Sequence, residues 1–123
     1  MIKRIIAYVE GPDDAAARDF YVNVLGLDVA MEDPVLGLRS GDDPAAQVLV
    51  LQPGSTDPVP RWGIDLGTPE AVDTAHAEAV RRELRVVYPL TEESWGVRRF
   101  FVEDLGGNVV NVLAHVAGGS RAE

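Results

Sequence analysis

The sequence predicts an α+β fold in which two tandem βαβββ modules form one curved mixed sheet with a concave ligand-binding face. Three observations support this prediction. The chain has 123 residues, 46 % of them hydrophobic, which is enough to bury a core without disulfides or a structural metal. Short alternating apolar runs, typical of strands, flank two stretches with helical spacing. The same order of elements then occurs twice along the chain.

The first half opens with an alternating run rich in Ile, Tyr and Val over residues 3–9, which predicts a strand. Asp13 or Asp14 can cap the helix that follows, because a short carboxylate accepts hydrogen bonds from the free N–H groups of the first turn. Gly26 is expected to end this helix, since glycine tolerates a left-handed backbone. Three further strands are expected over residues 27–32, 35–40 and 46–52.

The second half follows the same plan after a short, polar, proline-rich stretch. A strand over residues 61–66 precedes Thr68 and Pro69, which are suited to the cap and the first position of a helix over 70–83. Strands are then predicted over residues 84–88, where Pro89 should end the strand, 97–103 and 108–115.

The two halves align without a gap from the first strand into the second when the chain is shifted by 57 positions (61 − 4). This shift places Arg61 on Arg4 and Pro69 on Pro12, in agreement with the order of the elements. We therefore expect one domain made of two modules, at about residues 1–53 and 61–115. Residues 54–60 would be the linker and residues 116–123 a frayed tail.

Composition excludes several classes of function. With no cysteine, the chain has no thiol nucleophile, disulfide or zinc–thiolate site. A net charge of −9 argues against nucleic acid as a partner. No apolar run approaches the roughly 20 residues of a membrane span, and residues 1–4 lead directly into the first strand, unlike a signal peptide. A cytoplasmic location is expected.

The double βαβββ pattern resembles the vicinal oxygen chelate superfamily, which includes glyoxalase I, extradiol dioxygenases and bleomycin resistance proteins. Phe20-Tyr21 and the LGL at residues 25–27 resemble its helix-end signature. The runs WGVRRFFVED and GNVVNV, at residues 95–104 and 107–112, are similar to the WGxRxFxxxDPxGNxxEL run of the family. Three residues depart from the pattern, with Glu83 in place of glycine, Leu105 in place of proline and Asn111 in place of glutamate.

The resemblance implies that metal-using members take their ligands from the first and last strands of each module. The matching positions here are Arg4, Arg61 and Asn111, and residues 46–56 contain neither an acid nor a histidine. Arginine remains protonated and only donates hydrogen bonds, so it cannot coordinate a cation. One neutral amide oxygen is too weak a ligand by itself. We therefore expect no metal and no other cofactor.

Strand alternation selects the candidate ligand-binding residues. If Arg4 faces the concave side, Ile6 and Tyr8 do as well, whereas Trp62 faces the helix and belongs to the core. Trp95, in the loop before a strand, can close over a ligand or cap the sheet edge. The candidate ligand-binding residues are Arg4, Ile6, Tyr8, Arg61, Asp65, Trp95, Arg99, Phe101 and Asn111.

Each candidate also has a structural interpretation. Arg4 and Arg61 could bind an anionic or carbonyl-bearing ligand, but ion pairs with neighbours such as Asp65 are slightly favoured. Tyr8 and Phe101 could be walls for a flat ligand or ordinary packing residues.

The resulting hypothesis is a metal-free small-molecule-binding protein like the bleomycin resistance branch, which would sequester a drug or metabolite without chemistry. The arginines argue against a strongly cationic ligand, so antibiotic resistance is one possibility within this class. The alternative is a metal-independent lyase or isomerase that uses Asp65, Tyr8 or His115 for proton transfer.

The resemblance also implies a homodimer. Size-exclusion chromatography with light scattering tests this expectation, and a monomer at micromolar concentration would contradict it.

Overall fold

The computed structural model describes residues 2–116, so most of the tail expected over 116–123 lies outside the described residues. The first half comprises β1 (Arg4–Glu10), α1 (Asp14–Arg18), the π-helical segment η1 (Asp19–Val24), β2 (Asp28–Met31), β3 (Leu36–Arg39) and β4 (Ala46–Leu51). The second half comprises β5 (Trp62–Asp65), α2 (Pro69–Arg81), β6 (Val86–Glu93), β7 (Val97–Glu103) and β8 (Val109–His115). Neither helix is long and apolar enough to cross a membrane within residues 2–116.

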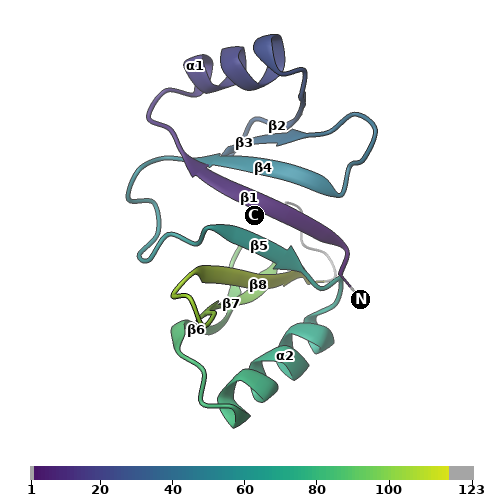
Figure 1. Cartoon of the computed structure of the whole chain (residues 1–123). Coiled ribbons are helices and arrows are strands. Elements are labelled where there is room, and N and C mark those ends of the chain that lie inside the picture. Colours follow the sequence, from purple (N-terminus) through teal and green to yellow (C-terminus); the bar gives the residue numbers. More distant parts are fainter. Residues whose placement is uncertain (1, 117–123) are drawn as a thin grey trace.

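All eight strands belong to one mixed sheet with the order β2-β3-β4-β1-β5-β8-β7-β6 (Figure 1). β1 and β5 are antiparallel neighbours at its centre. β1 pairs in parallel with β4, and β5 pairs in parallel with β8. Each half thus contributes its strands in the same relative order, which confirms the predicted fold class.

The apolar side chains form three separate clusters. The cluster next to α1 and η1 centres on Leu36, Leu38 and Val50, and the cluster under α2 centres on Val72 and Phe100. The third cluster lies on the inner face of the curved sheet and comprises Ile6, Tyr8, Leu49, Leu51, Val97 and Leu113. Because these inner side chains are buried, they fill much of the predicted concave face instead of leaving an open groove.

The outer face of the two central strands is left uncovered. The helices lie at opposite ends of the sheet (Figure 1), and α2 contacts β6, β7 and β8. Trp62 and Ile5, near the junction of the two halves, are therefore 41 % and 46 % exposed. The prediction that Trp62 is a core residue was wrong, because neither helix reaches the strand pair on which it lies.

β6 is longer than the sequence predicts. It continues through Pro89 as far as Glu93, although proline was expected to end it. The strand lies at the edge of the sheet, where a missing N–H costs no interior ladder bond. The register with β7 also shifts between Tyr88 and Thr91, so the irregular pairing accommodates the proline.

Both helices begin as the sequence predicts. The Asp13 carboxylate accepts hydrogen bonds from the N–H groups of Ala15 and Ala16, and the Thr68 hydroxyl accepts one from Ala71. The chain leaves both helices through a residue with a positive φ, but the type of residue differs. Gly26 has a φ of +89°, and Glu83, which occupies the corresponding place in the repeat, has a φ of +57°. Glutamate is strained in this conformation because its Cβ crowds the backbone.

Replacing Glu83 with glycine is expected to raise the free energy of unfolding by about 1 kcal/mol, because glycine adopts a positive φ without strain. The reverse change, Gly26→Ala, is expected to cost a similar amount. A Cβ at Gly26 would have no atom within 4 Å, so the cost would arise from the backbone alone. Urea titration of both variants measures the two effects, and a Glu83→Gly variant less stable than the natural protein would contradict the argument.

Candidate ligand-binding site

The inner face of the sheet contains a cavity of about 160 Å³. Its walls come from β1, β4, β7 and β8, from the segment between the two halves, and from the turns between β2 and β3 and between β6 and β7. The lining residues are Tyr8, Val35, Leu51, Ser55, Thr56, Pro60, Trp95, Arg99, Phe101 and Asn111. The cavity therefore unites Tyr8, Trp95, Arg99, Phe101 and Asn111 of the predicted site residues.

Aromatic rings supply much of the wall. Tyr8, Trp95 and Phe101 line the cavity from three different segments of the chain. The ring of Tyr8 lies directly over Gly63, where a Cβ would be 2.5 Å from the tyrosine hydroxyl. Gly63 is therefore needed for space, because any larger residue would push the Tyr8 ring out of its position.

Arg99 is the charged residue of the wall and is only 4 % exposed. Its Nε donates a hydrogen bond to Oε2 of Glu93 at 2.8 Å, and the same oxygen accepts one from the Tyr88 hydroxyl. The guanidinium carbon lies 5.1 to 5.4 Å from the ring centroids of Tyr88, Trp95 and Phe101. The charge of Arg99 is thus compensated by the largely buried carboxylate of Glu93 and by three aromatic faces.

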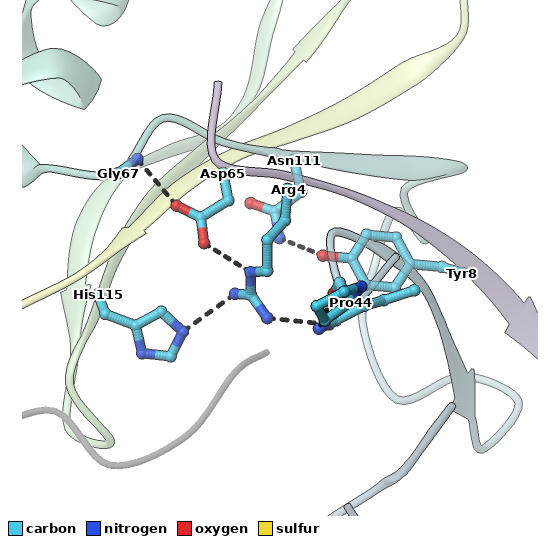
Figure 2. A network of polar contacts seen from close by, with 8 residues as sticks. Arg4, Tyr8, Pro44, Asp65, Gly67, Asn111 and His115 are labelled. Atoms are coloured by element: carbon cyan, nitrogen blue, oxygen red, sulfur yellow. Dashed lines mark hydrogen bonds and ion pairs between the residues drawn. The ribbon is translucent and has the colours of Figure 1, made fainter. Parts of the chain in front are cut away.

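Asn111 connects the cavity wall to the interior. It is fully buried, and its Nδ2 donates a hydrogen bond to the Tyr8 hydroxyl at 2.9 Å (Figure 2). Its Oδ1 has no hydrogen-bond partner in the described part of the chain, and the same is true of the buried Oγ1 of Thr56. Two residues of one cavity therefore each carry a buried oxygen with unused hydrogen-bonding capacity.

Arg4 lies outside this cavity, in a second polar cluster (Figure 2). Its Nε donates to Oδ2 of Asp65 at 2.8 Å, one Nη donates to Oε1 of Gln47 at 2.9 Å, and the other lies 3.1 Å from Nε2 of His115. Asp65, which is 1 % exposed, also accepts a hydrogen bond from the N–H of Gly67 at 2.9 Å. The favoured ion pair between Arg4 and Asp65 is confirmed.

His115 accepts a hydrogen bond from Arg4 in this cluster, so Nε2 carries a lone pair and the ring proton is on Nδ1. Burial lowers the pKa of His115 below its ordinary value of 6.5, and the positive charge of Arg4 lowers it further. Lys3 acts in the same direction, whereas Asp65 opposes them. The folded protein therefore favours the neutral imidazole.

Stability should consequently decrease as the pH falls through 6.5 towards the lower pKa of the folded state, because only the unfolded chain gains a proton in this interval. Urea unfolding at about pH 7.5 and about pH 5.5 measures this loss. A His115→Gln variant should lose less stability over that interval, since glutamine does not titrate. Equal pH dependence in the variant and in the natural protein would contradict the assignment.

The other predicted site residues lie elsewhere. Ile6 is part of the inner apolar cluster and is fully buried, so packing accounts for it. Arg61 precedes β5, is exposed and does not line the cavity. No ion pair of Arg61 occurs within residues 2–116, so pairing holds for Arg4 but not for its counterpart. Arg61 is therefore not part of the cavity wall, and its role in ligand binding stays a prediction.

Sequence reasoning missed the contribution of the segment between the modules. Ser55, Thr56 and Pro60 line the cavity, although the composition of this stretch predicts only a linker. The stretch contains one signal that could have found it. Val59 and Pro60 are apolar residues at the end of a polar run, and the structure buries Pro60 and packs Val59 against the inner cluster.

Comparison with known proteins identifies the class. The family model of the glyoxalase/bleomycin resistance protein/dioxygenase superfamily matches residues 5–112. The chain therefore belongs to this superfamily. No curated protein is significantly similar to it in sequence.

Solved structures share the fold. An NAD-dependent benzaldehyde dehydrogenase from Legionella pneumophila is 15 % identical with a TM-score of 0.74, over 90 % of this chain and 98 % of that one. Methylmalonyl-CoA epimerase from Mycobacterium tuberculosis is 16 % identical with a TM-score of 0.70, over 94 % and 87 %. The E323L mutant of homoprotocatechuate 2,3-dioxygenase from Brevibacterium fuscum is 26 % identical with a TM-score of 0.66, over 99 % of this chain but 34 % of that chain.

The residues at the metal-ligand positions of this superfamily do not suit a divalent metal. Arg4 and Arg61 offer only donors, and the Oε1 of Gln47 on β4 already accepts a hydrogen bond from Arg4. Asn111 leaves a single neutral oxygen. Within residues 2–116, no three His, Cys, Asp or Glu side chains come together as a possible metal site. The side chains at these positions therefore do not fit a bound divalent cation.

Proposed function

We propose that the chain is a metal-independent small-molecule-binding protein whose ligand occupies the inner cavity. The observation that supports this most directly is the cavity itself, which combines three aromatic walls with buried polar groups. Apolar walls with a few polar groups are the usual composition of a small-molecule site. The residues at the superfamily's metal positions, Arg4, Arg61 and Asn111, are poor metal ligands, which supports binding without a metal.

The alternative of proton-transfer catalysis has less support. Asp65 and His115 lie in the Arg4 cluster, and neither lines the cavity. Both carboxylate oxygens of Asp65 accept hydrogen bonds from within the protein. Tyr8 alone of the three residues reaches the cavity, where its hydroxyl accepts a bond from Asn111. A general base must lie within hydrogen-bond reach of its substrate, so these three residues do not form one reaction centre.

A thermal-shift screen tests the proposal. The panel contains planar aromatic compounds, small oxo-acids and cationic antibiotics, each measured with and without a chelator. A cavity ligand should raise the melting temperature, because it binds the folded state only, and the chelator should leave that rise unchanged. Metal analysis of the purified protein should find much less than one divalent ion per chain. Stoichiometric metal, or a ligand effect that the chelator abolishes, would overturn the metal-independent proposal.

A matched pair of variants locates the binding. Val35→Phe introduces a larger side chain at the cavity wall and should reduce the thermal shift caused by any ligand found. Val24→Phe makes the same change at an exposed position of η1 and should leave the shift intact. Each variant is compared with its own melting temperature without ligand. A shift that survives Val35→Phe unchanged would contradict binding in the cavity.

A further inference from the structure

The size of the cavity limits the ligand. A cavity of about 160 Å³ is close to the roughly 150 Å³ that holds one benzene molecule in an apolar protein interior. Sites for drug-sized ligands are usually larger, about 300 to 1,000 Å³. The aromatic side chains Tyr8, Trp95 and Phe101 offer flat surfaces against which a ring can pack. Volume and shape together favour a planar compound of one ring.

The charges at the cavity favour a neutral ligand. Arg99 is the only ionised side chain among the lining residues of the described chain, and Glu93 already compensates it. A carboxylate ligand would have to compete with Glu93 for the guanidinium. An ammonium ligand would be placed beside a buried positive charge. Neither ion would therefore meet an uncompensated opposite charge among the lining residues to offset its desolvation.

The unused polar atoms require a hydrogen-bond donor on the ligand. Oδ1 of Asn111 can only accept, and Oγ1 of Thr56 can accept as well as donate. Both oxygens are buried and have no partner within residues 2–116. A buried acceptor without a partner is unfavourable, and a donor supplied by a ligand would remove this penalty. A ring that lacks an O–H or N–H group would leave the acceptor of Asn111 unsatisfied.

We propose that the cavity binds a neutral, planar, one-ring compound whose edge carries an O–H or N–H group. This inference rests on the proposed function. Asn111 and Thr56 accept hydrogen bonds from that group, and Tyr8, Trp95 and Phe101 enclose the ring. The inference thereby names a ligand class and assigns a specificity role to Thr56, a residue of the segment between the two modules.

A matched series of ring compounds tests the class, with dissociation constants from NMR titrations of the full chain. Phenol and benzamide are neutral and carry donors, whereas anisole is neutral without one. Benzoate and benzylammonium carry opposite charges, and 2-naphthol adds a second ring. Phenol and benzamide should bind about tenfold more tightly than anisole, the difference that one hydrogen bond makes. The two ions and 2-naphthol should also bind more weakly than phenol.

Three variants test whether Asn111 and Thr56 accept the hydrogen bonds of the ligand. Thr56→Val and Asn111→Leu replace a polar side chain by an apolar one of similar size, so each should reduce the preference for phenol over anisole. Thr74→Val removes a hydroxyl on the exposed side of α2 and should leave this preference unchanged. Because Asn111 is fully buried and also donates to Tyr8, Thr56→Val provides the test that depends least on stability.

The outcomes separate this inference from the proposed function. If anisole binds as tightly as phenol, or an ion or 2-naphthol binds best, the ligand class is wrong while the cavity remains a binding site. If no compound of the series binds, the inference is overturned, and the thermal-shift panel decides the proposed function independently. A preference for phenol that is unaffected by Thr56→Val and by Asn111→Leu would overturn the assignment of the two acceptors.

Discussion

Replacing Asp65 with alanine is expected to lower the free energy of unfolding by about 3–5 kcal/mol. Asp65 is 1 % exposed, and the side chain of its partner Arg4 is 11 % exposed. Removal of the carboxylate would leave the guanidinium in the interior beside Gln47 and His115, neither of which carries a compensating negative charge. Equilibrium urea unfolding of the variant at neutral pH measures the loss.

Two further variants separate the buried pair from ion pairing in general. Asp73→Ala removes a carboxylate that bonds to Arg98 at 2.6 Å near the surface, and it should cost no more than about 1 kcal/mol. The double variant Arg4→Met/Asp65→Leu removes both charges and should recover much of the stability that Asp65→Ala loses. Equal losses for Asp65→Ala and Asp73→Ala would show that burial of the Arg4 pair is energetically unimportant.

Replacing Phe101 with alanine is the second change with a large expected effect, about 3–5 kcal/mol. Phe101 is fully buried, and its ring lies 4.7 Å from that of Tyr88 and 5.1 Å from the guanidinium of Arg99. The truncation would remove apolar contacts and leave a void next to the ligand cavity. It would also take away one of the aromatic faces that stabilise the buried charge of Arg99.

The matched control for this change is Phe20→Ala, because Phe20 is 50 % exposed and packs against Tyr21 at the surface. Its loss should be about 1 kcal/mol. Thermal and urea unfolding of both variants gives the comparison. A Phe101→Ala variant that is no less stable than Phe20→Ala would contradict the assignment of Phe101 to the structural wall of the cavity.

The order of the elements could be predicted because the signals are local. Alternation marks strands, Asp13 and Thr68 mark helix starts, and the repeat supports both assignments. The two wrong predictions, at Pro89 and Trp62, concern positions where the tertiary structure overrides the local pattern. Pro89 is tolerated because β6 lies at the sheet edge, and Trp62 is exposed because neither helix covers β1 and β5. Nothing in a local pattern specifies how far a helix extends across a sheet.

The site could be predicted only in part for a similar reason. Alternation correctly placed Tyr8, Phe101 and Asn111 on one face, since the period of a strand is fixed. It could not indicate where along that face space remains, because this depends on how the inner side chains pack. Ile6 therefore lies in the filled part, and Thr56 lines the cavity from a segment without periodicity.

The inner apolar cluster shows how the two halves of the chain depend on each other. Ile6 and Leu49 come from the first half, and Val97 and Leu113 come from the second, yet they bury one another. Either half alone would expose its share of these side chains to water, which is unfavourable. The repeat visible in the sequence thus does not divide the hydrophobic interior in two. Each half of the chain shields the inner side chains of the other half from water, and the cavity is lined by residues of both halves.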